Sequence, residues 1–327
     1  MLMIVGALGG TTYLYVSDVF TGKTAATFEI IDAVNDTVTI RNSGTGSLAS
    51  FNNVKIDGND AVYRVSKQDS SLVGYWKMDE GSGSTIADSS GNMNTGNLTN
   101  MNTTGNATSG WNSTDCKFGN CMKFDGINDR IVVSHGNTLD FDNSTSFTLS
   151  FWLKYDALRR QFMFDTRGTG QDGWAIETSV AGTTISMGGR DDDSTGFPAN
   201  GVSITDLGWH FYSFVLKRGV GLSIYKDGVL GNGPVLLTGI DNFTETSNFT
   251  IGDVAGGGFP CACLLDSVTV YRRALSEQEI KAEYDLGSQI NSGEIATIKI
   301  YNQLSKGTHT LRLCTSSICN TAILTVQ

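Results

Sequence analysis

Basic residues, prolines and histidines are scarce in this chain. Its 327 residues include 23 Lys and Arg against 33 Asp and Glu, for a net charge of −10, and only three Pro and three His. This acidic balance, without any basic cluster, argues against nucleic acid or an anionic lipid as a partner. The histidines lie far apart in the sequence, which argues against a histidine-based zinc or catalytic cluster.

Glycine is abundant instead, with 39 residues, and Ser, Thr and Asn are frequent. This composition is typical of β-sheets joined by polar turns, and the length suggests two domains. Short apolar or alternating runs separated by turn residues predict strands from Thr27 onward. One helix is predicted after Ser276, which would cap it, with Glu279 three residues on and an apolar stripe at Ile280 and Tyr284.

The six cysteines fall into three close pairs. An even number in close pairs favours disulfide bonds in an oxidising location, and a zinc site is the competing interpretation. The spacing of Cys261 and Cys263 is unfavourable for a bridge if both lie along one strand. The predicted bonds are Cys116–Cys121, Cys261–Cys263 and Cys314–Cys319.

Eight Asn-x-Ser/Thr motifs occur, and four of them gather in a stretch of Asn, Thr, Gly and Ser. This cluster predicts a glycosylated surface loop, with an ordinary polar loop as the alternative. The eight candidate asparagines are Asn35, Asn97, Asn102, Asn106, Asn112, Asn143, Asn242 and Asn248.

The stretch from Met1 to Phe20 is apolar, with Asp18 as its single charge. As a helix it would be about 30 Å long, which matches the hydrocarbon core of a bilayer. It lacks a basic start and a small-x-small cleavage site, which disfavours a cleaved signal. We predict a retained helix over the first 22 residues that packs with copies of itself through Gly6, Gly9 and Gly10. A simple membrane anchor is the alternative.

Two stretches of similar strand-type sequence flank a longer region of a different kind. Residues 23–68 and 288–327 are each too short to bury a core alone. We therefore predict that they combine into one small β-sandwich. Residues 69–287 would then form an inserted domain whose two ends lie close together.

The inserted region contains a series of short sequence motifs in a fixed order. They are Val73–Gly83, Ala87–Asn92, Phe118–Gly126, Phe147–Leu153, and Leu265–Tyr271 followed by Ala274–Ser276. In this order they resemble the laminin-G-like, concanavalin A-like jelly-roll family. The resemblance implies a β-sandwich of jelly-roll type with a lectin-like role.

The flanks resemble archaeal type IV pilins and archaellins. The resemblance lies in Tyr13–Ser17 after the hydrophobic start, in Thr39–Leu48, and in Ser292–Ile298 with Gly307–Leu311. Helices of this family are usually longer and follow a charged leader, so the chain is expected to be processed or truncated at its start. The resemblance implies a subunit that lies in the membrane and then polymerises with its helix in the filament core.

Structural calcium is the metal ion that the inserted region suggests, because carboxylate, amide and carbonyl oxygens are its usual ligands. Asp88, Asn92 and Asp266 match positions where relatives hold calcium, and Glu80 would contribute. A hydrogen-bonded Asx turn is the alternative for Asp88 and Asn92. Residues 191–193, three aspartates, are a second candidate, with a solvated acidic loop as the alternative.

Glycoside hydrolases also have concanavalin-type folds, and they need two carboxylates that face each other across a cleft. No predicted strand carries such a pair, so no catalytic residue is predicted. Trp76 and Trp152 are predicted to lie in the core. Trp111, Trp174 and Trp209 are candidates for stacking on a sugar or for packing.

Together these patterns predict a mainly β, extracellular subunit of an archaeal type IV pilus-like filament. It would display a lectin-like domain outward for adhesion or glycan binding. The alternatives are a monomeric membrane-anchored adhesin or receptor and, less favoured, a secreted glycan-active enzyme. The expected partners are further copies of the chain, surface glycans on a host or neighbouring cell, and the membrane before assembly, with no nucleic acid.

Overall fold

The computed structural model describes residues 27–327 except 49–50, 68, 106–107, 135, 137, 142–143, 168–172, 191–199, 238–246, 255, 286, 288–289 and 316–317. The predicted helix at Met1–Phe20, with Gly6, Gly9 and Gly10, therefore lies outside the described residues, as do the three aspartates 191–193. Within the part described, no helix is both long and apolar enough to cross a membrane.

The chain divides into two compact units, and the first is built from both ends of the sequence. It holds the residues up to Gln68 and from Gln278 onward, whereas Asp69–Glu277 form the second unit. The predicted insertion ended ten residues later, at position 287. The difference arises at the helix α1 (Glu277–Asp285), because Asp285 lies close to Tyr63 of the first unit. Burial, with the charge of Asp285, raises the pKa of the Tyr63 hydroxyl to about 12.

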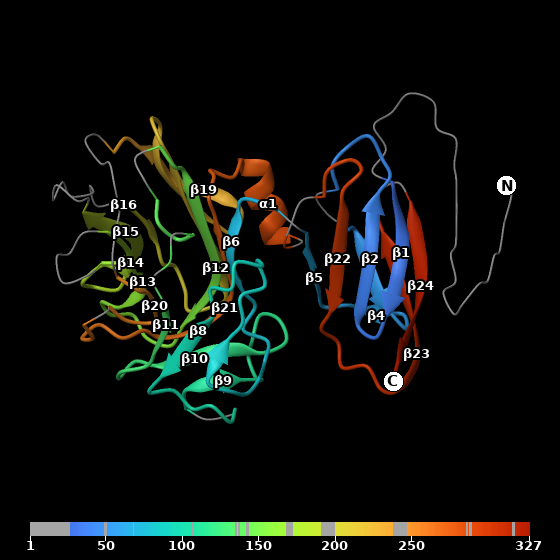
Figure 1. Cartoon of the computed structure of the whole chain (residues 1–327), viewed down its shortest axis with the longest axis horizontal. Helices are drawn as coiled ribbons and strands as arrows, with labels where there is room; N and C mark the ends of the chain where they lie inside the picture. Colours follow the sequence, from blue (N-terminus) through green and yellow to red (C-terminus); the bar gives the residue numbers. More distant parts are fainter. Residues whose placement is uncertain are drawn as a thin grey trace, which may run out of the picture. The chain divides into compact units, whose positions relative to one another are not determined.

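The first unit, called here the small sandwich, consists of two four-stranded antiparallel sheets (Figure 1). Alternating exposure along β22, with every second residue buried, is the pattern of a strand with one face on a core. One apolar cluster contains residues from both sheets, among them Val38, Ile298 and Leu311. The strand orders are β1 (Phe28–Val34), β2 (Thr37–Asn42), β22 (Ile295–Ile300), β5 (Tyr63–Ser66), and β24 (Cys319–Val326), β23 (Gly307–Cys314), β3 (Asn53–Ile56), β4 (Asn59–Asp60).

The second unit consists of two eight-stranded sheets around a larger apolar core. Its first sheet has the order β19 (Val229–Val235), β18 (Gly221–Lys226), β17 (His210–Lys217), β12 (Phe147–Tyr155), β21 (Ala262–Tyr271), β10 (Cys121–Asp125), β9 (Gly110–Asn112), with β6 (Leu72–Trp76) also paired to β21. Its second sheet has the order β16 (Asn200–Ser203), β15 (Thr184–Arg190), β14 (Gly173–Thr178), β13 (Phe162–Asp165), β20 (Phe249–Ile251), β11 (Arg130–Val133), β8 (Gly96–Thr99), β7 (Thr85–Ile86).

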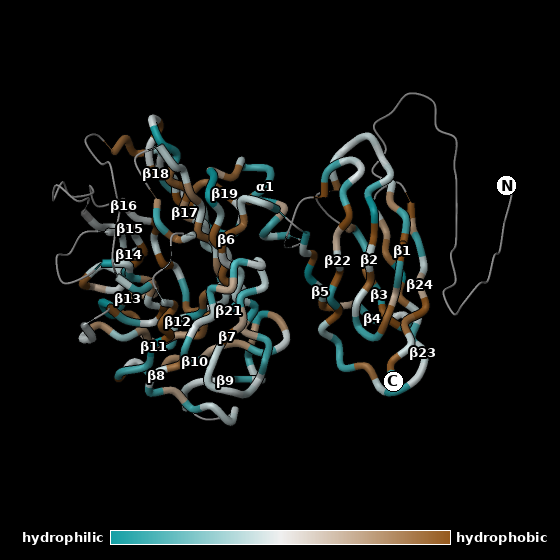
Figure 2. The backbone as a smooth tube through the Cα atoms, in the orientation of Figure 1, coloured by the Kyte–Doolittle hydropathy of each residue, from teal (hydrophilic) through white to brown (hydrophobic). Residues whose placement is uncertain are grey.

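The central strands of the second unit explain its continuous apolar runs. Every residue of β6 and β21 is buried, as expected where both faces of a strand are covered. Figure 2 shows hydrophobic residues concentrated along the strands and hydrophilic residues in the connecting loops. The predicted hairpin turn at Asp227-Gly228 is confirmed: both residues have positive φ, 52° and 76°, as a type I′ turn requires.

The two ends of the inserted unit lie together. Arg273 Nη2 forms an ion pair with Asp69 Oδ2 at 2.8 Å, and the Arg272 N–H donates to the carbonyl of Ser71 at 2.7 Å. In the small sandwich, β5 and β22 pair directly, with Ser66 opposite Thr297. In each unit, the two chain segments that lead to the other unit lie side by side. This is the geometry that tolerates an inserted domain.

Candidate functional site

All three predicted disulfide bonds are present: Cys116–Cys121, Cys261–Cys263 and Cys314–Cys319. The Cys261–Cys263 bond forms although its sequence spacing was expected to be unfavourable. Their Cα atoms are 5.5 Å apart, an ordinary value, and β21 begins only at Ala262, so Cys261 is not held in that strand.

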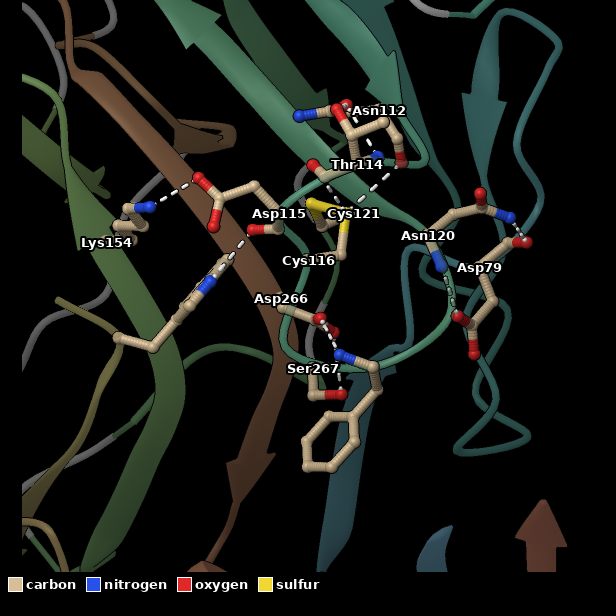
Figure 3. The surroundings of a disulfide bond; sticks show 12 residues. Asp79, Asn112, Thr114, Asp115, Cys116, Asn120, Cys121, Lys154, Asp266 and Ser267 are labelled. Carbon is tan, nitrogen blue, oxygen red and sulfur yellow. Dashed lines mark hydrogen bonds and ion pairs between the residues drawn. A yellow bond between two sulfur atoms is a disulfide. The ribbon is translucent and has the colours of Figure 1, made fainter. Parts of the chain in front are cut away.

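The Cys116–Cys121 bond closes a short loop over the outer face of the first sheet, around β10, β12 and β21 (Figure 3). The backbone N–H of Phe118 in this loop donates to Asp266 Oδ2 at 2.8 Å, and Ser267 Oγ lies 3.0 Å from Asp266 Oδ1. Asn120 is bonded to Asp79, with its Nδ2 2.9 Å from the Asp79 carbonyl. Both sides of the loop are therefore fixed, which pre-organises its side chains.

Aromatic and charged side chains gather beside this loop. Lys117 Nζ lies 3.8 Å from the ring centroid of Trp152, and the Phe118 ring meets Trp152 edge-on at 6.0 Å. Lys154 on β12 forms an ion pair with Asp115, and the Trp209 indole N–H donates to the Asp115 carbonyl at 2.9 Å. We call Asp115, Lys117, Phe118, Lys154 and Trp209 the loop face.

The loop face combines half-buried aromatic rings with exposed hydrogen-bonding groups. Lys117, Phe118 and Trp209 are half-buried. The side chains of Asp115 and Lys154 are 58% and 25% exposed. Apolar surface with a few fixed polar groups is the usual composition of a small-ligand or carbohydrate-size site. The loop face can therefore stack on an apolar ring face and bond polar substituents at the same time.

The histidine next to this face is held by two carboxylates. His210 Nδ1 lies 2.7 Å from Asp227 Oδ2, and its Nε2 lies 3.0 Å from Asp206 Oδ1. A hydrogen bond from the Gly208 N–H, together with the one from His210, lowers the pKa of Asp206. The arrangement fixes the loop that carries Trp209.

The predicted calcium ligands are occupied by protein hydrogen bonds. Asp88 Oδ1 accepts the N–H groups of Tyr75 and Ser90, and its Oδ2 accepts the Ser90 hydroxyl and the Asn94 N–H, at 2.8–2.9 Å. Asn92 Nδ2 donates to the carbonyl of Leu72 at 3.1 Å. These are the contacts of the alternative, a hydrogen-bonded turn.

The other two proposed ligands have protein partners as well. Glu80 Oε1 accepts the Ala87 N–H at 2.6 Å, and Asp266 bonds Phe118 and Ser267 as described above. In the described residues, no group of three or more His, Cys, Asp or Glu side chains could hold a metal ion. The calcium site stays a prediction.

The tryptophans separate clearly by burial. Trp76 and Trp152 are buried, which confirms their predicted core positions. Trp111 and Trp174 are only 1% and 2% exposed, so the sugar-stacking alternative is wrong for both, because neither presents a ring face. Trp209 alone of the three candidates keeps exposed surface.

Asp129 was not singled out by the sequence, although its neighbours Lys123–Gly126 were. Its side chain is fully buried, and one oxygen accepts the Asp125 N–H at 2.8 Å. The other oxygen has no hydrogen-bond partner among the residues described. Burial, reinforced by the Asp125 carboxylate, raises the pKa of Asp129 to about 6. A bare Asp in a turn gives no sequence signal of burial, so only the fold shows it.

The free energy of unfolding of the second unit is expected to fall between about pH 4 and pH 6, because the buried Asp129 carboxyl loses its proton in this range. In the unfolded chain the Asp129 carboxyl loses its proton near the ordinary pKa of 3.8. In the folded state its pKa is raised, so between these two pKa values only the folded state holds the proton. The stabilisation is therefore complete below the unfolded-state pKa and is lost as the pH rises through the folded-state pKa, at a cost of about 2–3 kcal/mol. Urea unfolding of the Asp129→Asn variant should show this fall abolished.

Asp125→Asn is the matched control, because it leaves the buried Asp129 carboxyl able to titrate. Most of the pH dependence should remain in this control. An Asp129→Asn profile as steep as that of the unchanged protein would contradict the assignment.

Comparison with known proteins shows a similarity that lies mainly in the second unit. Residues 125–281 match the laminin G-type family described as the concanavalin A-like lectin/glucanases superfamily. Most of this match lies in the second unit, Asp69–Glu277, and the two packed eight-stranded sheets of that unit agree with a concanavalin A-like jelly roll, so we call it the jelly-roll domain. No match was found among curated proteins.

Solved structures with a similar fold include two toxin binding domains. The chain is 17% identical to the binding domain of paraclostridial mosquitocidal protein 1, with a TM-score of 0.52 over 65% of this chain and 52% of that one. It is 15% identical to the binding domain of botulinum neurotoxin serotype G, with a TM-score of 0.51 over 65% and 50% of the two chains. The chain spans about half the length of these structures, and the likeness shows the fold alone.

Proposed function

We propose that the chain is an extracellular, non-catalytic binding protein whose jelly-roll domain recognises a carbohydrate through the loop face. The observation that carries the proposal is the fixed loop Cys116–Cys121, whose half-buried Phe118 ring belongs to the same face as the Trp209 ring and the charged groups of Asp115 and Lys154. The similar fold of toxin binding domains and the match to a lectin-type family support it. The three disulfide bonds support an oxidising, extracellular location.

Binding without catalysis is supported by the state of the carboxylates at this face. Asp115 is paired with Lys154, and Asp266 accepts bonds from the loop and from Ser267. A glycosidase needs two carboxyl groups free to act on opposite sides of one bond. These acids serve to hold the loop instead.

At a finer level, we propose that the small sandwich and the apolar stretch Met1–Phe20 make the chain a subunit of an archaeal type IV pilus-like filament. The support is architectural: a sandwich completed by both ends of the chain can display the jelly-roll domain from one surface connection, that between β5 and β22. The alternative, a monomeric membrane-anchored adhesin, uses the same domain in the same way.

A glycan array tests the binding role. The full chain is expected to bind a defined glycan subset, and Trp209→Ala should weaken that binding about tenfold, as loss of one stacked aromatic ring implies. Phe259→Ala is the control, because Phe259 is an exposed aromatic residue, 39% exposed, in another loop. Measurement with and without a chelator also tests the predicted calcium. Equal binding by both variants would remove the loop face from the proposal.

Electron microscopy of the full chain separates the two finer alternatives. Filaments that disappear when Met1–Phe20 is deleted would support the subunit role. A monodisperse monomer under all assembly conditions would contradict it and leave the anchored adhesin.

A further inference from the structure

Two of the Asn-x-Thr motifs, those at Asn102 and Asn112, form turns that are closed by side-chain hydrogen bonds. Asn102 Oδ1 accepts both the N–H and the hydroxyl of Thr104, each at 2.8 Å. Asn112 Oδ1 accepts the N–H and the hydroxyl of Thr114, each at 3.0 Å, and Figure 3 shows this pair beside the Cys116–Cys121 bond. In both, the motif closes on itself as an Asx turn.

This turn prepares the amide nitrogen for modification. Two hydrogen bonds on Oδ1 withdraw electron density from the amide and make its N–H protons more acidic, while Nδ2 is turned away from the bonded threonine. Within the residues that the structure describes, neither Nδ2 donates a hydrogen bond. The geometry therefore leaves a polarised amide nitrogen open to a reaction partner.

Among the described residues, the motifs at Asn35 and Asn97 lack this arrangement. Asn97 lies in β8, where it pairs with Thr85 on one side and Val132 on the other, so its backbone is extended. At Asn35, the threonine two residues on, Thr37, gives its hydroxyl to Asp36 instead. Asn106, Asn143 and Asn242 lie outside the described residues.

We propose that Asn102 and Asn112 are N-glycosylation sites preferred over Asn35 and Asn97, selected by their Asx turns rather than by sequence alone. Asn102 is exposed and Asn112 half-buried, so Asn102 is the more accessible of the two. The inference concerns a modification of the domain and does not depend on the proposed ligand.

The reaction requires a lipid-phosphate-linked oligosaccharide and a membrane-bound transferase. Asn Nδ2 attacks the anomeric carbon of the sugar, so that an N–C bond forms as the C–O bond to the phosphate breaks. The electron pair of that bond leaves with the lipid phosphate, and one amide proton is lost to a base. The Thr hydroxyl is not consumed, because its part is to hold the Asn oxygen.

Glycopeptide mass spectrometry of the full chain, made in a host with an N-glycosylation pathway, tests the inference. Occupancy should be higher at Asn102 and Asn112 than at Asn35, and at least several-fold higher than at Asn97, whose motif also ends in Thr. Thr104→Val should abolish modification of Asn102, while Thr104→Ser, which keeps the hydroxyl, should preserve most of it. Asn97→Gln is the matched control and should leave occupancy at Asn102 unchanged.

The result that would overturn the inference is equal occupancy at Asn97 and Asn102, or an unmodified Asn102 beside a modified Asn97. Circular dichroism of each variant establishes that it is folded. These outcomes are independent of the glycan array, because the array measures ligand binding whereas mass spectrometry measures modification of the chain.

Discussion

Replacing Trp76 by alanine is expected to lower the free energy of unfolding of the jelly-roll domain by about 3–5 kcal/mol. The Trp76 side chain is fully buried, packs at 5.5 Å from the Phe249 ring of the opposite sheet, and donates its indole N–H to the Asn94 carbonyl at 2.6 Å. Removal leaves a cavity at the contact between the two sheets and an unpaired carbonyl, and both cost free energy. Chemical denaturation followed by tryptophan fluorescence or circular dichroism measures the loss.

Trp76→Phe separates the two contributions. Phenylalanine keeps most of the buried ring but cannot donate to Asn94, so the expected loss is about 1–2 kcal/mol. The ring lies directly over Gly74, since a Cβ at that position would be 2.6 Å from the indole. An alanine variant that loses less than about 1 kcal/mol would show that the sheets close over the gap, and it would contradict the role given to Trp76.

Gly110→Ala is expected to be as damaging, for a reason of backbone space. A Cβ at Gly110 would stand 1.9 Å from the carbonyl oxygen of Asn102, and the backbone φ of +84° is a conformation that glycine alone adopts easily. Because the obstacle is backbone, the loop from Asn102 to Gly110 must move. We expect a loss of about 3 kcal/mol or more, combining strain with lost packing of the neighbouring Trp111.

Gly91→Ala is the matched control for this variant. Its φ is +93°, but no atom lies within 4 Å of the added Cβ. The control should therefore cost about 1–2 kcal/mol from backbone strain alone. If the two variants lose the same stability, the contact between Gly110 and Asn102 contributes nothing.

Much of the fold could be predicted from local sequence. Strands such as β12 and β21 are long stretches rich in apolar residues with turn residues beside them. The hairpin turn at Asp227-Gly228 is predicted from those two residues alone. The return of similar sequence at both ends predicted that the small sandwich is discontinuous. The strands and the hairpin depend on neighbours in the chain, which a sequence shows directly, whereas the discontinuity was predicted because each flank is too short to bury a core alone.

The candidate site depended on contacts that no local pattern shows. Trp209 reaches Asp115, 94 positions earlier, and Phe118 reaches Asp266, 148 positions later. Burial likewise separated Trp111 and Trp174 from Trp209, although all three sit near loop residues in sequence. Asp88 has a local sequence pattern that is ambiguous, because an acidic residue in a Gly-rich turn fits both a metal site and a turn held by hydrogen bonds. Only its four hydrogen bonds, from Tyr75, Ser90 and Asn94, show which contacts it makes.

The strand order of the small sandwich determines when it can fold. In one sheet β22 lies between β2 and β5, and in the other β23 lies between β24 and β3. Both of these inner strands come from the last 35 or so residues, so the N-terminal strands are synthesised more than 200 residues before their partners. Such non-local pairing is slow and leaves strand edges unpaired until synthesis ends. The small sandwich is thus completed only after the whole jelly-roll domain has been synthesised, so any surface built on it forms only once β22, β23 and β24 are present.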